Sequence, residues 1–284
     1  MAEQNSAWNG HLHSCLSTKI RLVVMSVLWF AGGCGGEDRG ADENLDVRIE
    51  FTVTAGGLPY QCGHVVDNLG KEGAALAITD MRFYIHDVRL INGQGEAQPV
   101  TLVDDGVWQK DGVALLDFED GCANGTRQLN SRVQGQSVDG SYTGIQFRIG
   151  IPNQLNSPRT VLENRGSPLN QASLFWSWRS GYKFMRVDTD SDSFRFHLGS
   201  VGCDDDFNCR FENIPTITMS GFEWQTQVVD LDIDHLLEET NVGENTDGTA
   251  PGCMGDPDDP ECRGIFARLG LGTAETTAFS VRAK

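Results

Sequence analysis

Apolar and polar residues alternate along much of this chain, as they do in strands that bury one face. Residues 45–54 read Leu-Asp-Val-Arg-Ile-Glu-Phe-Thr-Val-Thr, a strict two-residue period that predicts a half-buried strand. A second long strand is predicted over 81–91, ending at the Asn92-Gly93 turn. Shorter apolar runs predict further strands at 100–103, 113–118, 144–150, 214–219, 225–233 and 276–281.

Helical periodicity is scarce. Residues 232–240 predict a short helix that carries His235, and 241–260 is a polar loop rich in Gly and Asp. The 33 glycines supply many turns, and no composition break or fixed repeat divides residues 45–284. We therefore predict one all-β domain, an antiparallel β-sandwich with long disulfide-stapled loops and one or two short helices.

The first 33 residues are predicted to be an export signal. Lys19 and Arg21 precede an apolar run at 22–30 that is too short for a stable membrane anchor. The small residues at 31–33 stand directly before Cys34, as in bacterial lipoprotein signals. Lipid on Cys34 would attach the protein to the outer membrane, facing the periplasm or the cell surface, and an ordinary signal peptide is the alternative. The polar residues 34–44 are predicted to be a flexible tether.

Export determines how the remaining cysteines are interpreted. An even number of cysteines in an oxidising compartment indicates disulfides. The six that remain are Cys62, Cys122, Cys203, Cys209, Cys253 and Cys262. We favour two local pairs, Cys203–Cys209 and Cys253–Cys262, with Cys62–Cys122 joining distant strands. The alternative is a zinc site made of the two local pairs, whose spacings are wider than those usual for zinc.

The net charge of −18, from 40 acidic and 22 basic residues, argues against nucleic-acid binding. No hydrolase elbow, zinc-protease helix, phosphate loop or dinucleotide fingerprint is present, and we predict that the protein is not an enzyme. Three acidic runs, at 188–192, 204–206 and 256–261, are interpreted as solvated turns, with a structural calcium ion as the alternative.

Aromatic residues gather at 174–188, where Trp176 and Trp178 would point to the same face of a strand. The alternating run at 194–199 delivers His197, and we expect these two segments to be neighbouring strands. The rings are either ordinary core or the frame of a site. Three further histidines, His64, His86 and His235, belong to the predicted domain, and His86 lies on the polar phase of its strand. Imidazole suits copper, zinc or iron.

Several motifs of this chain together resemble one family of exported proteins. They are Arg82-Phe83-Tyr84-Ile85, Val88-Arg89-Leu90, Trp108-Gln109, Val113-Ala114-Leu115-Leu116-Asp117-Phe118-Glu119, Ser167-Pro168-Leu169-Asn170, Phe175-Trp176-Ser177-Trp178, Gly181-Tyr182-Lys183-Phe184, His197-Leu198-Gly199-Ser200, Gly252-Cys253-Met254 and Asp259-Pro260-Glu261-Cys262. The chain resembles the copper-associated MbnP-like proteins, also called metallo-mystery pair four-Cys motif proteins, over nearly all of the predicted mature chain.

The resemblance implies that the protein binds copper outside the cytoplasm, as Cu(I), and is paired with a di-haem protein of the cytochrome c peroxidase type. It also implies that this partner oxidises Trp176 to kynurenine, which then joins imidazole in binding the metal. His197, in the matching His-Leu-Gly motif, is the expected unmodified ligand. Relatives often have His where this chain has Ser157, and His64 and His86 are the available substitutes.

Three classes of function follow from these observations. The first is an exported copper-binding protein, matured by a haem partner, with a role in copper homeostasis or acquisition. The second is a structural or calcium-stabilised surface lipoprotein, in which the Trp pair is core and no transition metal is bound. The third is an enzyme with a mononuclear copper centre, which the lack of a recognisable acid, base or nucleophile set disfavours.

Overall fold

The fold is known from a computed structural model, which describes residues 44–122, 125–157, 164–177, 181–272 and 277–284. The predicted signal at 1–33, the lipid site at Cys34, nearly all of the tether and Trp178 lie outside the described residues. Among the residues described, no helix is both long and apolar enough to span a membrane.

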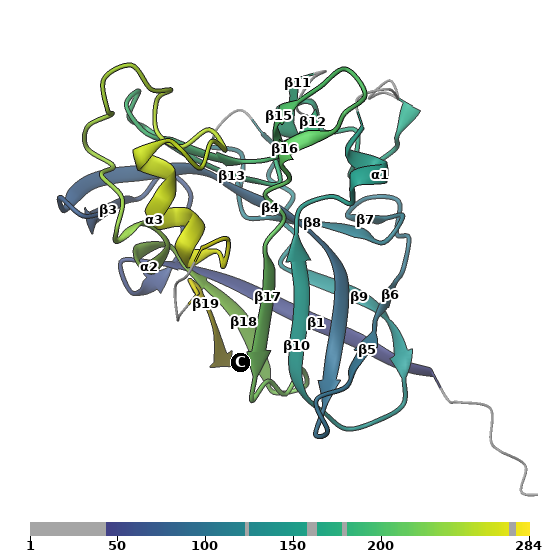
Figure 1. The fold of residues 1–284 in the computed structure, drawn as a ribbon. Coiled ribbons are helices and arrows are strands. Elements are labelled where there is room, and N and C mark those ends of the chain that lie inside the picture. The colour runs from purple at the N-terminus through teal and green to yellow at the C-terminus, as the bar shows by residue number, and fades with distance from the viewer. Residues whose placement is uncertain (1–43, 123–124, 158–163, 178–180, 273–276) are drawn as a thin grey trace, which may run out of the picture. The chain divides into compact units, whose positions relative to one another are not determined.

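Most of the described chain forms two sheets that pack face to face, as predicted (Figure 1). The first has the order β19-β18-β1-β9-β6, with β2 also paired to β1. Its strands are β1 (Asn44–Ala55), β2 (Leu58–Pro59), β6 (Thr101–Leu102), β9 (Arg132–Val138), β18 (Gln227–Asp232) and β19 (Phe279–Ala283). The alternation at 45–54 correctly predicts β1. One pairing differs from the antiparallel prediction, because β1 and β18 run parallel.

The second sheet is built on β4 (Ala74–Asn92), which is 19 residues long and changes neighbours along its length. Its main order is β14-β13-β4-β10-β17, and β3, β5 and β8 also pair with β4, while β7 pairs with β8. The bounds are β3 (Val65–Leu69), β5 (Ala97–Pro99), β7 (Gln109–Lys110), β8 (Val113–Asp117), β10 (Tyr142–Ile149), β13 (Met185–Thr189), β14 (Arg195–Leu198) and β17 (Thr216–Ser220).

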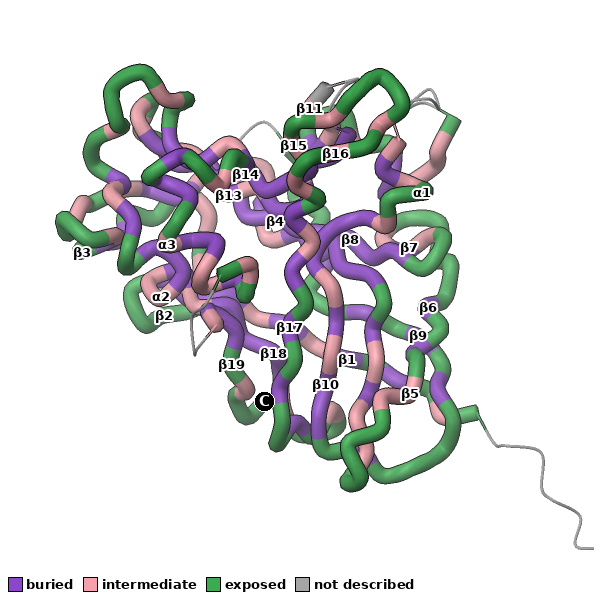
Figure 2. The backbone as a smooth tube through the Cα atoms, viewed as in Figure 1, coloured by how far each residue is buried: buried purple, intermediate pink, exposed green. Residues whose placement is uncertain are grey.

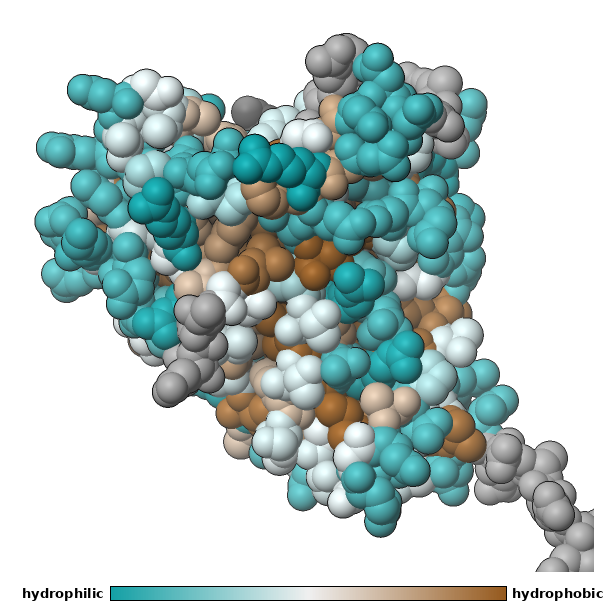
Figure 3. Space-filling model, viewed as in Figure 1, coloured by the Kyte–Doolittle hydropathy of each residue, from teal (hydrophilic) through white to brown (hydrophobic). Residues whose placement is uncertain are grey.

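Aromatic rings from both sheets fill the space between them. Phe51 of β1 meets Phe147 of β10 edge to face, with ring centroids 5.6 Å apart, and Phe147 meets Phe279 of β19 at 5.5 Å. Edge-to-face rings gain electrostatic energy beyond the burial of their surface. Buried residues follow the facing strands in Figure 2, and exposed residues follow the loops. In the view of Figure 3 the edge of the molecule is mainly hydrophilic, and hydrophobic atoms show in the middle.

The helices are short, as expected. They are α1 (Asn153–Asn156), the 3-10 helix η2 (Ala172–Leu174), α2 (Ile233–Leu237) and α3 (Pro260–Arg268). The pattern at 232–240 correctly predicts α2, whose N-cap Asp232 accepts a hydrogen bond from the backbone N–H of His235. The sequence analysis missed α3, although Asp259 caps it and Pro260 occupies its first turn, a standard start signal.

Three disulfides join Cys62 to Cys122, Cys203 to Cys209 and Cys253 to Cys262, which are the pairings that the sequence favours. The second pair closes the ribbon of β15 (Val201–Cys203) and β16 (Cys209–Phe211). The third ties the loop beside β14 to α3. Such bonds persist in oxidising compartments, which agrees with an exported protein.

Candidate metal centre

The aromatic segment at 174–188 is divided into three short strands, a correction to the expectation of one. They are β11 (Phe175–Ser177), β12 (Gly181–Tyr182) and β13. Gly181 begins β12 with φ of +69°, in the left-handed region that favours glycine. A Cβ there would also stand 2.3 Å from Oδ1 of Asn156. As predicted, β14 with His197 is a neighbour of this segment, because it pairs with β13.

His197 is held from both sides of its strand. On one side it stands opposite Arg186 of β13. On the other, its backbone N–H donates to the carbonyl of Cys253, 2.9 Å away, and the N–H of Cys253 donates to the carbonyl of Arg195 at 2.8 Å. The Cys253–Cys262 disulfide anchors this outer loop to α3. The imidazole is buried and fixed in place.

The indole of Trp176 lies next to this imidazole. Their ring centroids are 6.2 Å apart and the planes meet at 89°. Two glycines make room for the indole: a Cβ on Gly199 would stand 3.1 Å from its Cε3 atom, and one on Gly255 would stand 3.3 Å from its Cη2 atom. Trp176 is half-buried, so the residue keeps some exposure to solvent while its ring contacts a buried histidine.

Asp188 determines which nitrogen of His197 is available. Its Oδ1 atom is 2.6 Å from Nε2 of His197, and its Oδ2 atom accepts from Nε of Arg186 at 2.9 Å. Burial is the largest influence on the pKa of His197 and lowers it, against the opposing effect of Asp188. The neutral imidazole then donates its Nε2 proton to Asp188, which leaves the lone pair on Nδ1.

A buried charge network supports this carboxylate. Arg186 also contacts Asp80 at 3.1 Å, and Asp80 receives two hydrogen bonds from Arg82. Burial acts to raise the pKa of Asp188, but the hydrogen bonds from His197 and Arg186 outweigh this effect. The pKa therefore lies well below its ordinary value. Asp188 is therefore a permanent anion at neutral pH.

Asp117 lies opposite Arg82 on β8, at the edge of this network. Burial, with the negative charges of Asp80 and Glu119, raises its pKa from 3.8 to about 6 against the effect of Arg82. A raised pKa means that folding disfavours the ionised form. The stability contributed by the protonated carboxyl is therefore complete below about pH 4 and is lost as the pH rises through about 6.

We expect Asp117→Asn to raise the free energy of unfolding by about 1–3 kcal/mol at pH 8, because an amide carries no charge. The amide oxygen can still accept the backbone N–H of Glu119, as Oδ1 of Asp117 does. Denaturant titrations at pH 8 and at about pH 4 measure the difference, which should vanish in acid. Asp46→Asn, at an exposed position of β1, is the control. An equal gain at both pH values would contradict this explanation.

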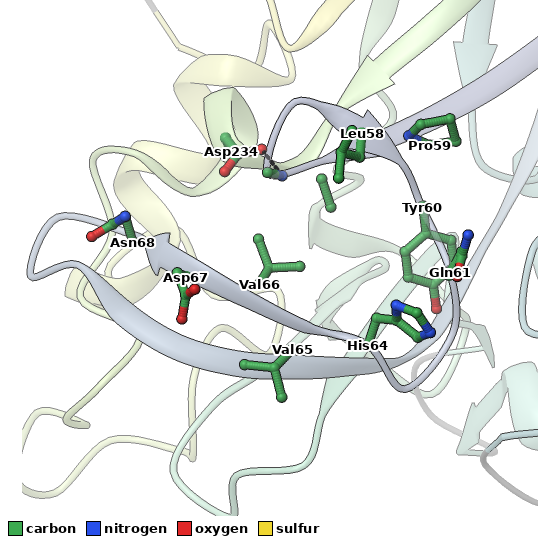
Figure 4. A pocket seen from close by; sticks show the side chains of 12 residues that line it. Leu58, Pro59, Tyr60, Gln61, His64, Val65, Val66, Asp67, Asn68 and Asp234 are labelled. Carbon is green, nitrogen blue, oxygen red and sulfur yellow. Dashed lines mark hydrogen bonds between the residues drawn. The ribbon is translucent and has the colours of Figure 1, made fainter.

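The other candidate histidines do not join His197. His64 is exposed and lines a pocket of about 710 Å³ with Tyr60 and Val65, at the opposite end from Asn68 (Figure 4). His86 is buried in β4, not on the surface as its phase suggested, and its Nδ1 atom is bonded to the carbonyl of Gly150 at 2.8 Å. Among the described residues, no three His, Cys, Asp or Glu side chains are placed to hold a metal ion.

Carboxylates of the three acidic runs bind backbone groups. Asp190 accepts from the N–H of Ala77, Asp204 from those of Asp206 and Asn208, and Asp256 from that of Asp258. Asp204 and Asp256 therefore close their own turns, whereas Asp190 binds the backbone of β4.

Ser157, where the family resemblance leads us to expect His, follows a residue that is bonded to the segments around the site. Asn156 accepts from the backbone N–H of Tyr182 at 2.9 Å and donates to Oγ of Ser200 at 3.2 Å. The backbone carbonyl of Ser157 accepts from Arg165. Asn156 and Asp188 are among the supporting residues that the sequence analysis did not identify as part of the site.

Comparison with known proteins places this geometry in a family. No curated protein matches the chain. A solved structure, MbnP from Methylosinus trichosporium, superposes with a TM-score of 0.73 at 25% sequence identity, covering 85% of this chain and 99% of that one. The family model for MbnP matches residues 44–255, which include Trp176, Asp188 and His197. The chain therefore belongs to the MbnP family.

Proposed function

We propose that this protein is an exported copper-binding protein whose site matures through oxidation of Trp176. The observation that carries the proposal is the edge-to-face contact of Trp176 with His197, whose Nε2 atom is held by the buried Asp188. A metal-binding histidine commonly donates its second ring N–H to a carboxylate in a hydrogen bond, which fixes the tautomer and raises the basicity of the ligand. Asp188 and His197 have this arrangement.

The unmodified indole cannot complete such a site, because its nitrogen carries a hydrogen and has no free lone pair. Kynurenine, the ring-opened product, has an aryl amine and a carbonyl in its place. The amine nitrogen is a neutral donor of the kind that suits Cu(I) together with imidazole. The ligands that we propose are thus Nδ1 of His197 and the modified side chain at position 176.

The oxidation needs an external oxidant, for which we propose a di-haem protein of the cytochrome c peroxidase type. Two peroxide equivalents add two oxygen atoms across the C2–C3 bond of the indole and leave as two waters. Hydrolysis then removes the formyl group as formate. The half-buried Trp176 keeps some exposure to such a partner, whereas core aromatic residues such as Phe51 and Phe147 have almost none.

The proposed cellular role rests on the expected export of the protein and on its net negative charge. We propose an outer-membrane lipoprotein, attached through Cys34, that binds copper for homeostasis or acquisition and does not catalyse a reaction. The net charge of −18 attracts cations to its surface.

Mass spectrometry of protein from the native host tests the modification. Conversion of Trp to kynurenine replaces one carbon atom with one oxygen atom overall, so the mass of the residue rises by about 4 Da and the donor-only indole N–H is lost. The tryptic peptide 166–179 holds both Trp176 and Trp178, so fragment ions must assign the gain to Trp176. Protein made without the haem partner should lack the gain and bind copper poorly.

The peptide that contains Trp224 is the internal control. Trp224 packs against the core, and among the described residues it has no ring contact with a histidine such as Trp176 has. An unmodified Trp176 in copper-loaded protein from the native host would disprove the maturation step.

A further inference from the structure

A second polar pocket, of about 280 Å³, lies where β4 and β10 approach α1. Its lining includes His86, Asp87, Arg148, Asn153 and Glu212. None of these residues contacts Trp176 or His197 in the described structure. The proposed copper site therefore does not account for this group.

A β-bulge lies beside the pocket. Between β4 and β10 the register passes from Arg89↔Gln146 to His86↔Arg148, so β4 carries one extra residue. Asp87 lies in the bulge with φ of +48°, a conformation that non-glycine residues adopt rarely. Bulges often redirect side chains beside functional sites. Here the bulge sets His86 directly opposite Arg148.

Arg148 is the unusual member of this group. Its Nε atom is buried with no hydrogen-bond partner, and no ion pair joins its guanidinium to another described residue. By contrast, neighbouring Arg89 is paired with Asp87 at 2.8 Å. A buried donor without a partner destabilises the folded state, and more so when it belongs to a charged group. Arg148 is partly exposed and lines the pocket, so its guanidinium is available to an anionic ligand in a chain of net charge −18.

His86 supplies a hydrogen-bond acceptor, whereas Arg148 supplies donors. Burial is the largest influence on its pKa and lowers it, and Arg148 lowers it further. The neutral ring donates Nδ1–H to the carbonyl of Gly150, so Nε2 is an acceptor on the wall of the pocket. Glu212 is a second acceptor there, with Oε1 bonded to Nδ2 of Asn153 at 2.6 Å.

We propose that this pocket binds a small carboxylate that also carries a hydrogen-bond donor, namely a small amino acid. The planar fork of Arg148 matches a carboxylate in two parallel hydrogen bonds. The ammonium group would face Nε2 of His86 and the carboxylate of Glu212. Phosphate carries more negative charge and no donor of this kind, so Asp87 and Glu212 would repel it. The volume suits a molecule of a few heavy atoms.

The test is a titration of the copper-free protein followed through the ¹⁵N resonances of the His86 ring. The probes are glycine, acetate and inorganic phosphate. We expect saturable shifts with glycine at about millimolar concentration, weaker binding of acetate, and weakest binding of phosphate. Arg148→Gln should weaken glycine binding by at least about tenfold, and Arg148→Lys, which keeps the charge but loses the fork, by a smaller factor.

Arg48→Gln removes the same charge from an exposed position of β1 and should leave glycine binding unchanged. If none of the probes gives saturable shifts in the parent protein, or if Arg148→Gln binds glycine as tightly as the parent, the pocket is not a carboxylate site. Phosphate binding tighter than glycine binding would overturn the assignment of the ligand. Arg148→Lys is the control for misfolding, because it retains a positive charge at the same position.

Discussion

Replacement of His197 by Ala is expected to abolish stoichiometric copper binding while the protein stays folded. The imidazole is the nitrogen donor beside Trp176, and Asp188 leaves its Nδ1 lone pair available. Without His197, Asp188 keeps its ion pair with Arg186 at 2.5 Å, so no buried charge is left alone. The cost to folding should therefore remain near that of one charge-assisted hydrogen bond, about 1.5–3 kcal/mol. Equilibrium dialysis against Cu(I), with protein matured by the haem partner, measures the stoichiometry.

His64→Ala and His86→Ala are matched controls, because each removes an imidazole that lies in a separate pocket. Both should bind copper as the parent does. Trp176→Phe keeps an aromatic ring between the glycines but cannot become kynurenine, so we expect it to lose copper as His197→Ala does. Retention of one copper ion per chain in His197→Ala would remove this residue from the site, and loss in His86→Ala would bring His86 into it.

The alternation of apolar and polar residues predicted strands such as β1 and β17, because each buries alternate residues along much of its length. It located β1, β10 and β18 to within a few residues. It could not show that β1 and β18 run parallel, since strand direction depends on how distant segments pair. It also treated 174–188 as one strand, because nothing in the period reveals the reversal at Gly181.

The candidate site was predicted in part. The strand period placed His197 beside the aromatic segment, and the structure brings its ring to Trp176. The period did not identify Asp188, which appeared in the sequence as the first residue of an acidic turn. Its role depends on the β13–β14 register, in which Arg186 stands opposite His197 and Asp188 lies on the diagonal. That register is set by tertiary packing, which no local pattern contains.

For His86, the strand period predicted the wrong environment. Its phase in β4 suggested a surface position, but the residue is only 5% exposed. Segments that follow β10 lie over this face, because Nδ1 of His86 is bonded to the carbonyl of Gly150 and Asn153 lines the same pocket. Strand phase does not show which later segment covers a face, so phase alone does not determine burial.

Asp188→Asn is expected to have the largest effect on stability and copper affinity together. The half-buried Arg186 would lose its anionic partner on β13 but keep Asp80 at 3.1 Å, so the cost should be near that of a lost hydrogen bond between charged groups, about 1.5–3 kcal/mol. The amide can also turn its NH₂ group toward Nε2 of His197, which favours the tautomer that places the proton on Nδ1 and blocks the lone pair needed for copper. Loss of such a supporting partner lowers metal affinity by about 10- to 100-fold.

The dependence on pH separates this effect from a general loss of packing. Because folding lowers the pKa of Asp188, its contribution to stability is present above the unfolded value near about 4 and is lost as the pH falls through the lower folded value. The stability gap between parent and Asp188→Asn, measured by denaturant titration, should therefore be full at pH 7 and narrow progressively below about pH 4. Asp192→Asn, at an exposed position of the same turn, should change stability by less than about 0.5 kcal/mol. A gap that stayed constant down to the lowest pH at which the parent is folded would assign the loss to packing, and the carboxylate charge would then not be what holds His197 in place.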